Sequence, residues 1–172
     1  MMTRFLLICT LLITPSLLWA KGVYQEPSDF VAEQFDQNPP KASVIWLKKD
    51  IKKELAEILQ HNYSGLRIRY WKDAEQSVWV LNEIGKEKPI SIGFVVKEGK
   101  ITLSRVLIFR ESRGWEIRHP FFTNQFTGAS LVNDNELDRH IDSISGATLS
   151  VRAYKKLSRI ALLLDAKIRK AP

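Results

Sequence analysis

Four small residues at positions 145–148, Ser-Gly-Ala-Thr, stand directly before the most helix-like segment of the chain. The first turn of a helix leaves backbone N–H groups without partners and carries a partial positive charge, so it stabilises an anion such as a phosphate. Ser145, Gly146 and Ala147 are small enough for a ligand to approach the backbone, and Thr148 adds a hydroxyl group. Arg152, one turn later, can face the same side. The arrangement suits a phosphate.

These residues also have a purely structural interpretation. Serine, threonine and glycine are ordinary caps at the start of a helix. Residues 145–148 alone therefore do not distinguish a helix cap from a phosphate site. The neighbouring residues are needed to choose between the two interpretations.

The longer stretch DSISGATLS, residues 142–150, resembles the flavin-attachment motif of the FMN-binding domain family. In that family an aspartate precedes the Ser-Gly-Ala-Thr tetrad, and its threonine carries FMN through a phosphoester bond. Asp142 and Thr148 hold these two positions here. The domain occurs in the C subunit of the sodium-pumping NADH:quinone reductase, in the G subunit of the Rnf complex and in small exported FMN-binding proteins. The resemblance extends over about residues 66–164.

The upstream stretch 109–131 is similar to the small exported members, in which a glutamate and a glycine-containing loop precede a Gln-Phe pair. Glu111, Gly114, Gln125, Phe126 and Gly128 fill those places. The chain has ESRGWE where the respiratory-complex subunits have a stretch like ETPGLG, so the quinone-reductase partners do not carry over directly.

The resemblance implies FMN as cofactor and a separate flavin transferase that takes FMN from FAD outside the cytoplasm. It implies that Asp142 helps the transferase or its metal to recognise the site. It also favours an electron carrier over a stand-alone enzyme, with a membrane or haem protein as the redox partner. No catalytic residue is therefore assigned. The alternative from another class is a non-redox module that reversibly binds a phosphate-containing or anionic ligand.

Other side chains of the 111–134 stretch have two open interpretations. The aromatic ones could contact the isoalloxazine ring or belong to the core; these are Trp115, Phe121, Phe122 and Phe126. The arginines of this stretch, Arg113 and Arg118, and Arg152 of the following helix could favour a reduced flavin anion or bind the phosphate. Alternatively, they could pair with Glu111 and Glu116 at the surface. His119 could donate to the ring, but a lone histidine is more often structural.

Hydrophobic spacing predicts the elements that position these residues. Helices are expected at 28–35, over most of 43–60, briefly at 135–142, and at 149–167, where the apolar stripe is long. From Leu66 the pattern alternates and predicts four strands, the last two joined by a Glu-Gly hairpin turn. The expected fold is α+β, a single domain with an antiparallel meander covered by helices. Its expected parts are an N-terminal helical segment at 21–65 and the FMN-binding domain at 66–172.

The first twenty residues have the pattern of a secretory signal peptide. Arg4 precedes an almost wholly apolar run at 5–18, and Ala20 ends the segment. Cleavage after Ala20 predicts a periplasmic or exported protein; the alternative is a retained anchor, for which the run is short. Cleavage would also remove Cys9, the one cysteine, and leave no thiol chemistry.

The formal net charge of +7 suits an anionic ligand, partner or membrane surface, or reflects solvated helix faces. Export argues against nucleic acid as the partner. His61 and His140 have no companion at metal-ligand spacing, so no metal site is predicted.

Overall fold

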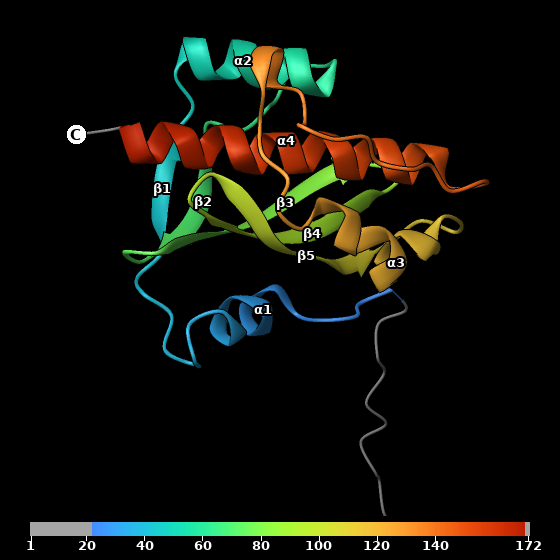
Figure 1. The fold of residues 1–172 in the computed structure, drawn as a ribbon, viewed down its shortest axis with the longest axis horizontal. Coiled ribbons are helices and arrows are strands. Elements are labelled where there is room, and N and C mark those ends of the chain that lie inside the picture. Colours follow the sequence, from blue (N-terminus) through green and yellow to red (C-terminus); the bar gives the residue numbers. More distant parts are fainter. Residues whose placement is uncertain (1–21, 171–172) are drawn as a thin grey trace, which may run out of the picture.

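The computed structural model describes residues 22–170 and is built on one five-stranded antiparallel sheet. Each strand pairs with the next one along the chain, in the order β1-β2-β3-β4-β5 (Figure 1). The strands are β1 (Ser43–Trp46), β2 (Arg67–Lys72), β3 (Gln76–Ile84), β4 (Pro89–Lys97) and β5 (Lys100–Phe109). The predicted α+β fold and its four-strand meander are confirmed, with β1 as an additional edge strand.

The turn between β4 and β5 is the hairpin that the Glu-Gly pair predicts. Glu98 and Gly99 both have positive φ, 50° and 74°, and the flanking Lys97 and Lys100 pair directly. Two consecutive positive φ angles belong to the turn type whose twist matches that of paired strands.

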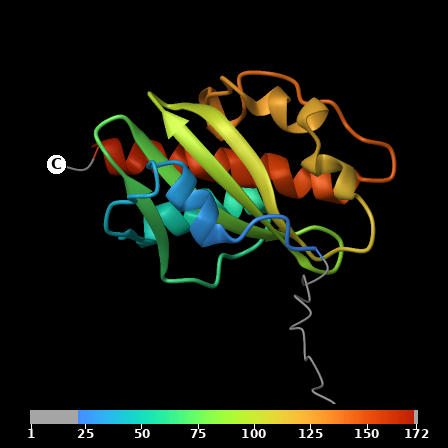
Figure 2. The same cartoon turned by 90° about the horizontal axis from the view of Figure 1, so that it is seen from below.

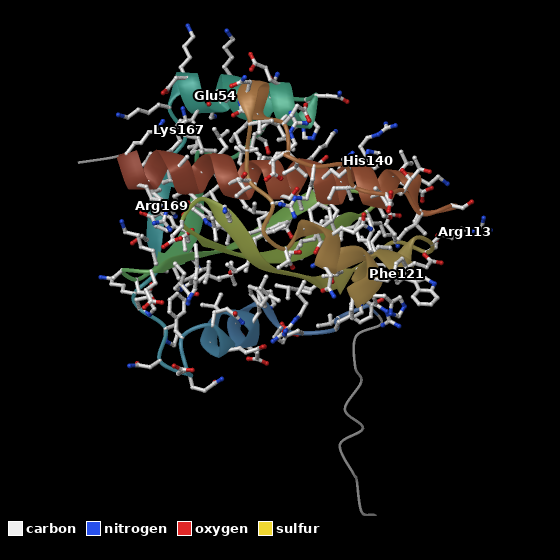
Figure 3. All side chains as sticks on the ribbon, in the orientation of Figure 1. Glu54, Arg113, Phe121, His140, Lys167 and Arg169 are labelled. Atoms are coloured by element: carbon white, nitrogen blue, oxygen red, sulfur yellow. The ribbon has the colours of Figure 1, made fainter. Side chains whose placement is uncertain are left out.

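A long helix, α4 (Thr148–Lys170), covers one face of the sheet, and α2 (Lys49–Leu59) lies on the outer side of α4 (Figure 1). The predicted apolar stripe of α4 is buried, including Val151, Leu157 and Leu164. Lys167 Nζ on α4 lies 2.6 Å from Glu54 Oε1 on α2 and ties the two helices together (Figure 3). The closing helix is confirmed, since it begins one residue before and ends three residues after the expected 149–167.

The other face of the sheet is covered in part by α1 (Pro27–Glu33), which Figure 2 shows in front of the strands with α4 behind them. Phe30 and Val31 of α1 pack on Val78, Val95 and Leu107. Gly93 makes room for this helix, because a Cβ there would lie 2.4 Å from the Phe30 ring.

The expected helix over 43–60 is wrong in its first part. Residues 43–46 form β1, whose side chains alternate in burial and which pairs with β2 from Ser43↔Tyr70 to Trp46↔Arg67. The sequence of β1 is rich in β-branched and aromatic residues, and pairing with β2 selects the strand. The segment 21–65 therefore contains a strand as well as two helices.

The expected short helix at 135–142 is also wrong. A single 3₁₀ turn spans Asn133–Asn135, and Asn135 then adopts a left-handed φ of 58°, which ends it. Leu137 forms an isolated bridge with Leu131, and Arg139 donates to the backbone oxygens of Thr127 and Gly128 at 2.9 and 2.8 Å. These contacts hold the segment extended against the preceding loop.

The stretch 111–134 folds into short helical turns instead of an open loop. They are a 3₁₀ helix at Trp115–Arg118, α3 (Pro120–Thr123) and a 3₁₀ helix at Asn124–Phe126. They lie at the end of the sheet where α4 begins (Figure 1).

Candidate functional site

Thr148 is the first residue of α4 and its side chain is exposed. The helix ladder starts where Val151 N–H donates to Ala147 O at 2.9 Å, so the N–H groups of residues 148–150 have no partner within the helix. The first turn of α4 holds no acidic side chain that could compete for them. The start of α4 is therefore open to an anion.

Gly146 shapes the turn that leads into this helix. Its φ is 81°, and a Cβ at this position would meet nothing within 4 Å. The left-handed backbone, and not crowding, is what favours glycine here. Ala147 N–H closes the turn on Ile144 O at 3.0 Å, and the Ala147 side chain is buried.

Gly114 brings the 111–114 loop onto the first turn of α4. Its φ is 86°, and a Cβ would lie 2.5 Å from Ser150 Oγ and 3.4 Å from Ala147 Cα. Only glycine meets both demands, because a side chain would be strained by the backbone and blocked by the helix. This contact places Ser112 and Arg113 beside Thr148.

A cavity of about 540 Å³ lies at this junction. Three segments line it: the turn before β4, the loop after β5 and the start of α4. The lining residues are Lys86, Glu111, Ser112, Arg113, Gly146, Ala147, Thr148, Leu149 and Ser150. Two cations and a threonine hydroxyl thus surround the open helix terminus, a donor set suited to a phosphate. Figure 3 shows Arg113 at this end of the molecule.

The Glu111 carboxylate binds the protein's own backbone. Its Oε1 accepts hydrogen bonds from the backbone N–H groups of Lys86, Glu87 and Lys88 at 2.5, 2.7 and 2.9 Å. Partial burial favours a higher pKa for Glu111, but these three bonds outweigh it and lower its pKa. Glu111 therefore fixes the β3–β4 turn to the loop and positions Lys86 at the cavity.

Gln125 and Asp142, predicted separately, are in direct contact. Gln125 Oε1 accepts a hydrogen bond from Asp142 N–H at 2.7 Å, while the Asp142 side chain is 82% exposed and lies 3.7 Å from His140. Gln125 thus holds the backbone of the segment that leads to Thr148 and leaves the Asp142 carboxylate accessible.

Residues 85–163 match the family model described as the FMN-binding domain. This part of the chain is an FMN-binding domain. The protein therefore binds flavin, and its cofactor is FMN. The matched range includes Lys86, the 111–114 loop and the whole 142–150 motif, so it covers every segment that lines the cavity. A search among curated proteins found no match.

Two of the aromatic candidates of the FMN-binding domain belong to the core. Phe122 and Phe126 are fully buried and contact Tyr154 of α4, with ring centroids 5.3 and 4.6 Å away. Burial raises the pKa of the Tyr154 hydroxyl. Phe126 therefore supports the loop from inside and does not line the cavity.

The other aromatic and arginine candidates do not line the cavity at Thr148, except Arg113. Trp115 is 43% exposed and lines a second cavity of about 570 Å³, which shares Glu111 and Ser112 with the first. The Arg118 guanidinium lies over both the Trp115 ring, at 5.0 Å, and the Tyr24 ring, at 4.5 Å. Phe121 is exposed beside His119 (Figure 3). Arg152 is exposed and is not among the residues lining either cavity.

Lys86 is the charged residue at the cavity that the sequence did not predict; Ser112, Leu149 and Ser150 also line the cavity and were not predicted. Lys86 lies in a polar turn, where a lysine is the ordinary choice, and its side chain is exposed and paired with Glu87 at 3.1 Å. The only sequence signal was its place at the start of a hairpin, and its proximity to Thr148 depends on the Glu111 contact.

Between residues 22 and 170 no helix is long and apolar enough to cross a membrane. The same residues contain no group of three or more histidine, cysteine, aspartate or glutamate side chains that could hold a metal ion.

Proposed function

We propose that the domain carries FMN covalently, as a phosphoester on Thr148 Oγ, and that it transfers electrons outside the cytoplasm. The observation that carries the proposal is the exposed Thr148 hydroxyl at the open start of α4, in a cavity with Lys86 and Arg113. FMN, when bound, supplies one-electron and two-electron transfer.

The attachment is a phosphoryl transfer made by a separate flavin transferase. Thr148 Oγ forms the new bond to phosphorus of the FMN half of FAD, the bond from that phosphorus to the bridging oxygen breaks, AMP leaves with that oxygen and the electron pair, and the hydroxyl proton is released to solvent. The free N–H groups of residues 148–150 stabilise the phosphate charge, and Lys86 and Arg113 add to this. The accessible Asp142 carboxylate is available to the transferase or its metal.

We also propose that the protein is exported. The support is the apolar run at 5–18 and the Ala20 that ends the segment, all of which lie outside the described residues. A covalent tether suits a compartment without free flavin, because a dissociated cofactor could not be replaced there. The surplus of positive charge suits an acidic surface on a membrane or haem redox partner.

Intact mass and visible spectrum of the protein, exported together with a flavin transferase, test the attachment. We expect a mass increase equal to FMN less one water and flavin absorption that survives denaturation. Thr148→Val should abolish both, and Thr148→Ser, which keeps a hydroxyl, is the matched control that should retain at least part of the labelling.

Two outcomes would contradict this proposal. Flavin that is released on denaturation, with no mass increase, would leave a reversible FMN-binding module. An unchanged mass increase in Thr148→Val would place the bond on another residue.

A further inference from the structure

The sheet splits between β2 and β3, far from the FMN site. The two strands pair only at Tyr70↔Trp79, Trp71↔Val78 and Lys72↔Ser77. If the ladder continued in the same register, Arg69 would face Val80, Ile68 would face Leu81 and Arg67 would face Asn82. None of these pairs forms, although both strands continue through these residues.

β2 remains attached to β1 where it leaves β3. The β1–β2 register runs from Ser43↔Tyr70 to Trp46↔Arg67, so the two strands diverge from the rest of the sheet together. Figure 1 shows β1 and β2 at the end of the molecule where α4 finishes. The result is a slot between β2 and β3, with residues of both strands along its walls.

A cavity of about 670 Å³ occupies this slot, and all six residues of the missing pairs line it. Its inner end is aliphatic and is closed by α2, α4 and the two strands; the residues there are Leu59, Ile68, Leu81, Leu157 and Ile160. The volume is within the usual range for small-molecule sites, and such sites combine an apolar body with few polar groups. An apolar chain or ring system therefore fits the inner end.

The outer rim of the slot is basic. Lys41, Arg67 and Arg69 line the cavity, and no aspartate or glutamate does. Arg67 and Arg69 are two residues apart on β2, so they point to the same face. Across residues 22–170 neither guanidinium has an ion pair or a side-chain hydrogen bond, and Arg67 rests on the Trp46 ring at 5.6 Å. Stacking on an aromatic face leaves the in-plane N–H donors of an arginine free for an anion.

We propose that this slot binds an anionic amphiphile, a molecule with an acyl-type apolar chain and a carboxylate or phosphate head. The chain lies against the aliphatic inner end, and the head is held by Arg67 and Arg69 at the rim. Leu157 and Ile160 follow Thr148 on α4 by 9 and 12 residues, about 14 to 18 Å along the axis. The slot is thus separate from the FMN site, and the inference does not rest on the proposed function.

Laurate, used below its micelle concentration, is the probe. We expect saturable one-to-one binding to the ¹⁵N-labelled protein, with amide shift changes concentrated on residues 67–69 and 80–82. Arg67→Gln/Arg69→Gln should weaken binding by at least about tenfold, because charge-assisted bonds to the carboxylate are lost. Binding should also weaken as salt is raised.

The control variant is Lys49→Gln/Lys100→Gln, which removes the same charge from exposed positions outside the slot. It should bind laurate as the wild type does, and unchanged thermal unfolding should show that both variants are folded. The proposal is overturned if laurate shifts no slot residue, if the arginine variant binds equally well, or if dodecyltrimethylammonium binds as tightly. Binding of an acidic extended peptide in place of laurate would also overturn it and identify the slot as a strand-insertion site.

Discussion

Gly114 and Gly146 both have positive φ, but only Gly114 also lacks room for a Cβ. At Gly146 the backbone alone makes an L-residue unfavourable, whereas at Gly114 the first turn of α4 blocks the side chain as well. The distinction matters for the proposed FMN site, because Gly114 is the point where the loop after β5 touches the helix that carries Thr148.

Gly114→Ala should lower the free energy of unfolding by about 2 to 4 kcal/mol, of which the left-handed backbone accounts for about 1 to 2. Gly146→Ala is the matched control, with similar φ and no clash, and should lose only the backbone part. Chemical denaturation of both variants checks this. Equal losses would contradict the close packing of the loop on α4.

Glu111 acts at the scale of elements, because one carboxylate oxygen joins the β3–β4 turn to the loop after β5. Glu111 Oε1 accepts hydrogen bonds from three backbone N–H groups, which belong to residues 23 to 25 positions earlier in the chain. This contact links the turn that carries Lys86 to the loop that packs on α4.

Glu111→Ala should therefore speed hydrogen exchange of the amides of residues 86–88 and lower the stability by about 1 to 2 kcal/mol. In the folded wild type the pKa of Glu111 is lowered. The three hydrogen bonds therefore stabilise the fold fully above the ordinary pKa of glutamate, and this stabilisation is lost as the pH falls through the folded pKa. Exchange at 86–88 in the wild type should become faster, relative to other protected amides, below that pH. Glu87→Ala, on the same turn but paired only with Lys86 at the surface, should leave these amides unchanged.

At the scale of the whole molecule, hydrogen bonds join the layers at several places away from the proposed FMN site. His61, just after α2, bonds Glu83 of β3 at 3.0 Å, and Lys156 Nζ on α4 donates to Leu59 O at the end of α2. At the far end of α4 the buried Asp165 accepts from Ser77 Oγ at 2.6 Å and from Arg169 at 2.7 Å. The bond from Ser77 joins the C-terminal part of α4 to β3 of the sheet.

The His61 contact makes global stability depend on pH. The hydrogen bond to Glu83 raises the pKa of His61 above its ordinary value of 6.5. A raised folded pKa gives stability that is complete below pH 6.5 and is lost as the pH rises through the folded value. Since the His61 side chain is 51% exposed, the effect should be about 0.5 kcal/mol.

Thermal unfolding of the wild type and His61→Gln at pH 5.5 and pH 8 checks this dependence. The wild type should be more stable than the variant at pH 5.5, and the difference should shrink at pH 8. His140→Gln is the control, because His140 is exposed and has only a 3.7 Å contact with Asp142. A difference that grows with pH would contradict the assignment.

The sequence by itself determined the features that depend on near neighbours. Alternating side chains from Leu66 onward predicted the meander, the Glu-Gly pair predicted its last hairpin, and the apolar stripe predicted α4. The 142–150 motif pointed to FMN through its resemblance to the FMN-binding domain family. The helix start itself could be expected because a helix start and its caps involve only a few consecutive residues. The placement of Ser145, Gly146, Ala147 and Thr148 in one turn follows from the same local signals.

Only the tertiary structure decided what distant segments do together. The spacing of apolar residues predicted a helix that included residues 43–46, and pairing with β2 made this segment a strand. Phe126 could have faced a flavin or the core, and contact with Tyr154 of α4 put it in the core. Lys86 lies at the cavity beside Thr148, and its turn is bound by Glu111, 25 residues away. The slot between β2 and β3 lies where the pairing of these two strands stops. Propensity and spacing act over a few residues, whereas these outcomes depend on contacts that exist only after the chain has folded.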